Sequence, residues 1–579
     1  MPIKFEAKDK LLGDILTGRE KYKIPRYQRP YSWTTDNISD LWNDLQEESA
    51  FLGSFVFNCE KENTGEFVEV IDGQQRLITL TILMAVLRDT YKELGNDDKF
   101  RLTQETIAHK DPITGKETYR LKCGDSLNDF FCENIQRQNS HIISSTPREK
   151  EKRAVKDNYK FFKDEIIAEL NLKDNISQKI EYLDNLKRKV FDYKIIEIKT
   201  GNDEDAYSIF ETVNARGADL TIADLLKNFL FSRLLPTTEN DVDFAKKTWS
   251  TIENNIENAG ARLTISKFIR YFWLSKYTFV PEKKLYKEVK RLIKEPNTFL
   301  SDISKASDYY YKIANKSINP TAWLEEFKDE KTGRRIHESL IGLRTMGITQ
   351  CYALLFCLLI NKDRIGFDFS DTFKVIEKYH FAYSAICKLP GNIVERTYFN
   401  TAQEIQQALK IDNVKKRTKV IQSILTKFKN KLDYPKKEFF IEKFMDVEYT
   451  DHSLVIYILS TIEKQMGFRE IRYEFDRTNI EHILPREPKE WGLFKKDIQN
   501  YVDKLGNLTL IAEKINGSMG NKPLREKIKL FKNSKLSTNK KLVKTFKLLK
   551  YKWGEKEINE RQRELAEFAY DTVWKFKEN

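Results

Sequence analysis

The sequence predicts an α+β protein of several domains that is mostly helical. At 579 residues the chain is long enough for two or three domains, each with its own core. Short apolar runs that end in polar turns favour strands near both ends, whereas helical periodicity dominates from about residue 246 to 433. We therefore expect three domains, at residues 1–240, 241–435 and 436–579.

Composition excludes several classes of protein. The beginning of the chain lacks the apolar core of a signal peptide, and no stretch reaches the ~18 apolar residues that span a bilayer. The cysteines are scattered without a Cys-x-x-Cys pair, so neither a zinc ribbon nor a disulfide framework is indicated. We expect a cytoplasmic protein. The six cysteines are Cys59, Cys123, Cys132, Cys351, Cys357 and Cys387.

The first polar motif lies at residues 70–80, Val-Ile-Asp-Gly-Gln-Gln-Arg-Leu-Ile-Thr-Leu. A short strand is predicted to end at Ile71, and helical periodicity begins at Leu77. Backbone donors at the helix start, together with the Arg76 guanidinium, favour a phosphate cradle. The alternative is an ordinary helix start, capped by Asp72, with a surface arginine. The chain has no Walker A glycine loop, which argues against a P-loop ATPase.

Two further motifs accompany it. Residues 24–33 carry Tyr-Gln-Arg-Pro-Tyr with three aromatic side chains, which would be costly to leave in water as an exposed loop. Residues 206–228 predict one helix that ends at Gly217 and a second that is capped by Thr221. Asn214 and Arg216 lie at this junction, where they could face the same pocket.

The three motifs together resemble the N-terminal domain of the GmrSD-type restriction endonucleases over about residues 8–235. The resemblance implies a ParB/sulfiredoxin-like core that binds and hydrolyses a nucleoside triphosphate, GTP or ATP, and senses modified DNA. Matching the motifs implies a nucleotide site of Gln28, Arg29, Asp72, Gly73, Gln74, Gln75 and Arg76, with Asn214 and Arg216 as weaker members.

The middle of the chain predicts a helical bridge without a catalytic cluster. Helical patterns run over residues 285–293, 352–359 and 405–425, and charged stretches at 329–335 and 433–437 are typical of connections. The histidines lie far apart in sequence, and we expect none of them to be functional: His337, His380 and His452.

The richest motif is Asn-Ile-Glu-His-Ile-Leu-Pro at residues 479–485, followed by Leu-Gly-Asn-Leu-Thr-Leu at 505–510. His482 is a candidate general base, because an imidazole titrates near neutral pH. Glu481 and Asn516 offer the hard oxygen ligands that Mg²⁺ or Mn²⁺ prefers. Asn507 would hold the backbone around the histidine. The alternative is a lone histidine at the end of a strand.

This pattern resembles the His-Me finger (HNH) nucleases over roughly residues 445–560. The resemblance implies a C-terminal ββα-metal finger in which His482 and Asn507 are catalytic and Glu481 and Asn516 bind the metal. The separation of Asn507 from Asn516 agrees with the family, but the loop that precedes Asn507 is longer than usual. Both GmrSD-like regions occur in one chain, in the family's order.

A basic segment follows this motif and contributes much of the chain's net charge of +13. Residues 521–556 hold thirteen Lys and Arg against two acids, and several lysines recur at helical spacing. After a nuclease motif, a phosphate-binding surface is favoured over a merely solvated face. The predicted DNA contacts are Lys540, Lys541, Lys544 and Lys547.

We interpret the chain as an NTP-dependent endonuclease of bacterial or archaeal defence that cuts modified phage DNA. Its partners would be double-stranded DNA and a triphosphate, and a homo-oligomer is left open. One alternative is an endonuclease that senses another mark, such as phosphorothioate DNA, or no mark. A second is a nucleotide-switched DNA-binding regulator whose nuclease domain is inactive.

Overall fold

The computed structural model confirms an α+β protein that is mostly helical. The chain separates into two compact units, residues 1–245 and 246–579. The predicted division of the second unit near residue 435 stays a prediction. The structure describes residues 5–25, 28–45, 51–59, 67–110, 115, 117–138, 149–201, 205, 209, 221–234, 243–260, 263–327, 329–450, 452–467, 478–512 and 519–576.

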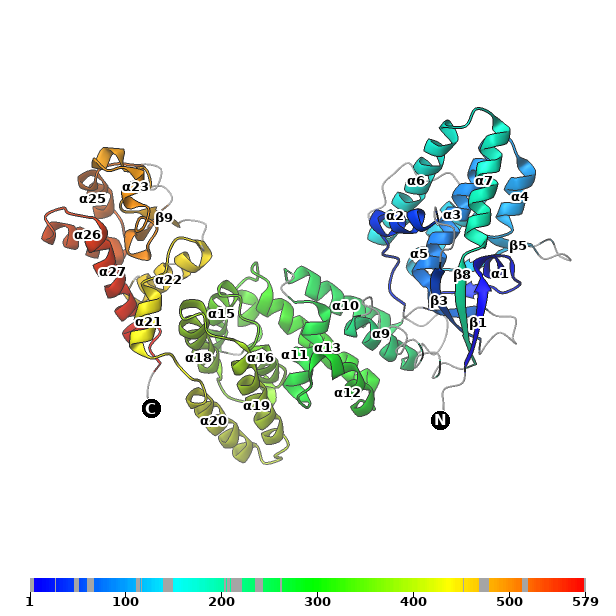
Figure 1. Ribbon diagram of the computed structural model, residues 1–579. Coiled ribbons are helices and arrows are strands. Elements are labelled where there is room, and N and C mark those ends of the chain that lie inside the picture. Colours follow the sequence, from blue (N-terminus) through cyan, green and yellow to red (C-terminus); the bar gives the residue numbers. More distant parts are fainter. Residues whose placement is uncertain are drawn as a thin grey trace. The chain divides into compact units, whose positions relative to one another are not determined.

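The first unit is built on a six-stranded mixed sheet of order β1-β8-β3-β4-β2-β7 (Figure 1). β8 lies antiparallel to β1 and parallel to β3, and β3 pairs antiparallel with β4. The predicted strand ending at Ile71 is β4, which ends one residue later. The strands are β1 (Phe5–Leu11), β2 (Tyr22–Lys23), β3 (Phe51–Asn58), β4 (Val68–Asp72), β7 (Leu121–Lys122) and β8 (Lys194–Thr200), and a separate pair is formed by β5 (Ala108–Lys110) and β6 (Glu117–Tyr119).

A central helix, α3 (Gln74–Glu93), forms the core of this unit. It is apolar on nearly every side and buried through most of its length, as expected of a helix enclosed by other elements. Residues of the sheet, α6 and α7 join its cluster. The other helices are α1 (Leu12–Thr17), α2 (Thr35–Asp44), α4 (Asp97–Gln104), α5 (Asp125–Phe131) with a π-helical turn at 132–136, α6 (Lys150–Asn171), α7 (Ile176–Phe191) and α9 (Ile222–Arg233), which Thr221 caps as predicted.

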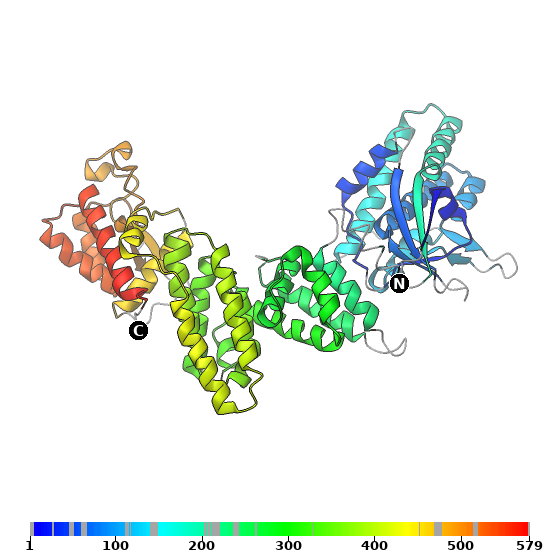
Figure 2. The same cartoon turned by 60° about the horizontal axis from the view of Figure 1, so that its bottom comes forward.

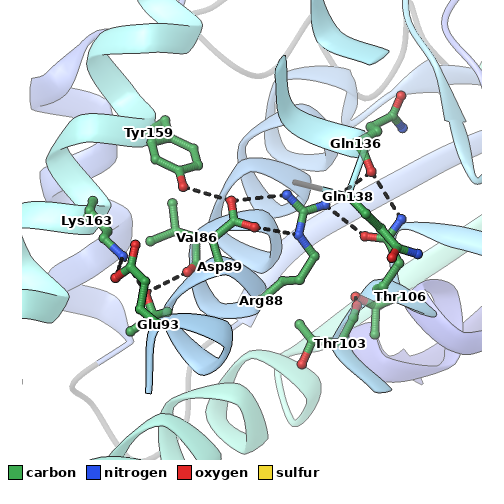
Figure 3. Close-up of polar contacts among 12 residues, drawn as sticks. Val86, Arg88, Asp89, Glu93, Thr103, Thr106, Gln136, Gln138, Tyr159 and Lys163 are labelled. Atoms are coloured by element: carbon green, nitrogen blue, oxygen red, sulfur yellow. Dashed lines mark hydrogen bonds and ion pairs between the residues drawn. The ribbon is translucent and has the colours of Figure 1, made fainter. Parts of the chain in front are cut away.

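A buried polar network ties α3 to its neighbours (Figure 3). Arg88 has no exposed surface and donates to Asp89, to Gln104 and to the carbonyl of Gln136. Tyr159 of α6 donates to the same Asp89 carboxylate at 2.8 Å. Buried charge is tolerated when it is paired and hydrogen-bonded, so this network fixes the register of α3 and α6.

The second unit begins with stacked helices, and two expectations for this region are wrong. Residues 329–335 open a helix, because the Asp329 side chain accepts from the backbone of Lys331 and Thr332 as an N-cap. Residues 405–425 form two helices, separated at 409–413, where Asn413 caps the second. The helices are α10 (Phe244–Asn258), α11 (Ile265–Lys276), α12 (Leu285–Leu292), α13 (Pro296–Ala314), α14 (Thr321–Leu324), α15 (Glu330–Thr345), α16 (Tyr352–Ile360), α17 (Lys362–Ile365), α18 (Ser370–His380), α19 (Asn392–Ala408) and α20 (Val414–Asn430).

The unit ends in a small two-stranded sheet surrounded by helices. β9 and β10 pair antiparallel, and α22 and α27 contribute to the core against which they pack. No helix in the described part of the chain has the length and apolar character needed to cross a membrane. These elements are α21 (Lys437–Phe444), α22 (His452–Gln465), β9 (Thr478–His482), α23 (Lys495–Ile498), β10 (Leu508–Ala512), α25 (Leu524–Lys532), α26 (Ser537–Leu548) and α27 (Glu555–Phe568).

Candidate active site

His482 is the last residue of β9, and Asn507 fixes the chain that follows it. The buried Asn507 side chain accepts from Leu484 N and Trp553 Nε1 and donates to the carbonyls of Leu484 and Val502, at 2.8 to 3.0 Å. Its amide group is therefore fully used within the protein. Asn507 lies where the sequence suggested, against the backbone beyond the histidine, while its part in catalysis stays a prediction.

The imidazole of His482 lies in a cluster that sequence reasoning missed. Its Nε2 lies 2.8 Å from Asp503 Oδ1, and the same oxygen accepts from Arg486 Nε and Nη2 at 2.8 and 2.7 Å. The centroid of the Tyr449 ring lies 5.3 Å from the centroid of the imidazole and 4.9 Å from Arg486 Cζ. Nδ1 has no hydrogen-bond partner among the described residues.

Backbone hydrogen bonds hold the segment that carries Asp503. Residues 447–449 run beside 503–505: Tyr449 N donates to Asp503 O at 2.8 Å, and Leu505 N donates to Val447 O at 3.1 Å.

Burial lowers the pKa of His482, and the hydrogen bond to Asp503 only partly opposes that change. The imidazole is therefore mostly neutral near pH 7, the form that can accept a proton.

Glu481 points to a different partner. Lys527 of α25 is completely buried, and its Nζ donates to Glu481 Oε1 at 2.6 Å and to His482 O at 2.7 Å. Burial raises the pKa of Glu481, while the Lys527 ammonium opposes the rise. This ion pair fastens β9 to α25, next to the histidine.

The fit of this region to a metal ion is incomplete. One carboxylate oxygen of Glu481 is already bonded to an ammonium group, and Asn516 lies outside the described residues. Within the described ranges, no group of three His, Cys, Asp or Glu side chains is arranged to hold a metal. A metal ion bound through Glu481 would have to compete with Lys527.

The predicted basic surface lies on α26. Lys540, Lys541, Lys544 and Lys547 are exposed, whereas the opposite face of the helix buries Leu542, Val543 and Phe546. Glu463 of α22 has no exposed surface and accepts from the backbone N–H groups of Ser537 and Thr538 at the start of α26. A buried carboxylate at a helix start fixes that helix firmly, so the four lysines have a defined position.

The Asp-Gly-Gln-Gln-Arg motif connects β4 to α3 in the first unit. Gly73, and not Asp72, caps the helix, with φ of 93°. A Cβ there would lie 2.4 Å from Phe55 Cδ1, so only glycine fits. The Arg76 guanidinium donates to Leu52 O at 2.6 Å and to Ser54 O at 2.8 Å, and it pairs with Asp72 at 3.1 Å. Any phosphate would compete with these bonds.

The two amino-terminal motifs meet at this turn. Gln75 accepts from Ser32 N at 2.9 Å and donates to Pro30 O, and Gln28 Nε2 donates to Ile71 O at 2.8 Å. Gln74 is buried at 5% exposure, yet its Oε1 has no partner among the described residues. Arg29 is half-buried and makes no side-chain hydrogen bond or ion pair with the described residues. Asn214 and Arg216 lie outside the described residues.

Comparison with known families gives two matches. A family model described as "GmrSD restriction endonuclease, N-terminal domain" matches residues 11–231. Another, described as "GmrSD restriction endonucleases, C-terminal domain", matches residues 434–568. The first match contains the turn between β4 and α3, and the second contains the His482 cluster and α26. No curated protein matches the chain.

Proposed function

We propose that this chain, which belongs to the GmrSD restriction endonucleases, hydrolyses phosphodiester bonds of DNA at His482. The observation that carries the proposal is the hydrogen bond between His482 Nε2 and Asp503, which leaves Nδ1 without a partner among the described residues. A carboxylate that accepts a hydrogen bond from one ring nitrogen keeps the proton on that nitrogen, so the other nitrogen has a free lone pair. His482 is thereby suited to act as a general base.

In the proposed reaction, Nδ1 takes a proton from a water molecule whose oxygen attacks phosphorus. A new P–O bond forms, the P–O bond to one sugar breaks, and that sugar oxygen takes up a proton from solvent. The Asp503 carboxylate stabilises the imidazolium that forms. Arg486, half-exposed beside the imidazole, would bind a non-bridging phosphate oxygen. Tyr449 supports both groups.

Mg²⁺ or Mn²⁺ remains part of the proposal, in keeping with a His-Me finger fold for the last part of the chain. When bound, such an ion would neutralise charge on the phosphate. Asn516 and Glu481 are the proposed ligands, and no step above depends on them. Loss of cutting in EDTA with recovery on adding Mg²⁺ or Mn²⁺ would support the ion, and undiminished cutting in EDTA would contradict it.

We further propose that the first unit is a ParB/sulfiredoxin-like domain that binds and hydrolyses GTP or ATP at the turn between β4 and α3. Two features of the described residues support a nucleotide site. Arg29 makes no side-chain hydrogen bond or ion pair with them and can bind a phosphate oxygen, and the buried Gln74 Oε1, an acceptor without a partner among them, can accept from a sugar hydroxyl or a base amino group. Gln28, Asp72, Gly73 and Gln75 would shape the turn, and Asn214 and Arg216 remain candidate members. Arg76 would act chiefly by bracing β3 against α3.

The proposed biological role is the restriction of modified phage DNA, with triphosphate binding controlling the cut. The test is a cleavage assay on matched modified and unmodified phage DNA, with and without each triphosphate. Cutting confined to modified DNA and changed several-fold by a triphosphate would support the role. Equal cutting of both DNAs would refute dependence on modification, and indifference to every triphosphate would refute the switch. An absence of nicking under all conditions would favour a regulator with an inactive nuclease.

A further inference from the structure

The helix α20 carries an unusual charge pattern in a region where the sequence predicted only a bridge. Within Val414–Asn430 it has six Lys and Arg and no acidic residue. α20 packs beside α19, the neighbouring helix in Figures 1 and 2. Its inward side buries Ile421 and Phe428, and Phe428 contacts Tyr398 of α19. The helix therefore has one apolar side committed to the core and one charged side.

Four lysines form the outer face of α20: Lys415, Lys416, Lys419 and Lys427. All four are exposed. Lys415 and Lys419 lie about one turn apart, and Lys416 and Lys427 lie about three turns apart on the same side. At ~1.5 Å of rise per residue, the face extends over roughly 18 Å. Arg417 turns inward instead and donates to the carbonyls of Arg364 and Ile411.

The four amino groups have no ion-pair or hydrogen-bond partner within the described part of the chain. Four other lysines of this unit, exposed or half-buried, do have partners at 2.6 to 3.0 Å: Lys276 with Asp302, Lys431 with Glu404, Lys437 with Asp571 and Lys443 with Glu442. A helix face that is merely solvated commonly carries acidic residues among its lysines, and the α20 face has no acidic residue. Its positive charge is thus left for an external anion.

We infer that this face of α20 is a second surface that binds the phosphate backbone of duplex DNA, separate from α26. The inference rests on the proposed function, because it assumes that the protein acts on DNA. Duplex DNA presents about one phosphate per 1.7 Å of axis, so a face of roughly 18 Å spans about ten phosphates. Lysines bind phosphate as point charges without reading bases, so this surface gives affinity independent of sequence or modification.

The test compares two variants of the full-length protein that lose the same charge. The first is K415Q/K416Q/K419Q/K427Q; glutamine retains helix propensity close to that of lysine. The control is K276Q/K431Q/K437Q/K443Q, which neutralises four lysines that are already paired. Affinity for an unmodified duplex is measured across a series of salt concentrations, with thermal melting as a check of folding.

The α20 variant is expected to bind at least ten-fold more weakly near 0.1 M salt. Its log-log salt slope should be smaller by about 2 to 4, since each phosphate contact contributes ~0.9. The control should change little. If wild type binds DNA and the two variants behave alike, α20 is only a solvated face and the inference is overturned. If wild type binds no duplex at all, the proposed function fails together with it, a result distinguishable from the first.

Discussion

Replacing Asp503 with asparagine tests whether the carboxylate beside His482 takes part in catalysis. The amide oxygen of asparagine can still accept from His482 Nε2 and Arg486, so the geometry is kept while the negative charge is lost. The charge matters most when His482 becomes an imidazolium, in the transition state. Asp503→Asn should therefore lower kcat and leave DNA affinity nearly unchanged.

The size of the effect follows from the hydrogen bond and its exposure. A hydrogen bond to a charged group contributes about 1.5–3 kcal/mol. The Asp503 side chain is 36% exposed, so solvent screens its charge and the contribution is reduced to about 1–2 kcal/mol. At ~1.36 kcal/mol per factor of ten, kcat should fall roughly 5- to 30-fold.

The assay is single-turnover cleavage of plasmid DNA under saturating enzyme, together with DNA affinity and thermal melting. Glu490→Gln is the matched control, because it removes one exposed negative charge from the same loop region without touching the cluster. A variant Asp503→Asn that cuts at the wild-type rate would refute the role of the carboxylate. A loss of rate matched by an equal loss of DNA affinity or a lower melting temperature would mean that Asp503 is merely structural.

Three further outcomes are expected. Lys527→Met should lower the free energy of unfolding by about 3–5 kcal/mol in urea titrations, because it leaves Glu481 buried without its cation. Adding Glu481→Gln should restore much of that loss, and additive losses in the double variant would contradict the pairing. Burial lowers the pKa of His380 to about 3, below the ~6.5 of an unfolded chain. Its contribution to stability is therefore fully present above about pH 6.5 and falls by roughly 3 kcal/mol by pH 4, because the unfolded chain takes up a proton that the folded chain does not. A His380→Gln variant with an unchanged slope of stability against pH would contradict this. Arg29→Ala should weaken triphosphate binding, measured by calorimetry, and leave the melting temperature unchanged. Arg76→Ala should lower the melting temperature, because Arg76 donates to two carbonyls of β3. The opposite pattern would reverse the roles assigned to the two arginines.

Local sequence signals predicted much of the fold. The strand β4, the helix after Gly73 and the Thr221 cap follow from neighbouring residues, so the sequence contains the information directly. The errors arise where one residue has two uses. Asp329 begins a charged stretch that is typical of a loop, but its side chain satisfies the first N–H groups of a helix.

Only those parts of the candidate site that are neighbours along the chain could be predicted from the sequence. His482 and Asn507 stand in recognisable motifs, whereas Asp503 joins His482 across 21 positions, where Asn507 donates both to Leu484 O and to Val502 O and so holds the two segments together. Lys527 reaches Glu481 across 46 positions from a separate helix. Such contacts depend on tertiary packing, and no spacing rule in the sequence predicts them.

The most direct test of the account is cleavage by His482→Ala, measured in a single turnover beside wild type on the same DNA. Loss of a general base costs ~10² to 10⁴ in rate, so cutting should fall at least a hundred-fold. DNA affinity and melting should stay as in wild type, since α26 and the Asn507 bonds are untouched. Cutting by purified His482→Ala at the wild-type rate would contradict the assignment of the active site.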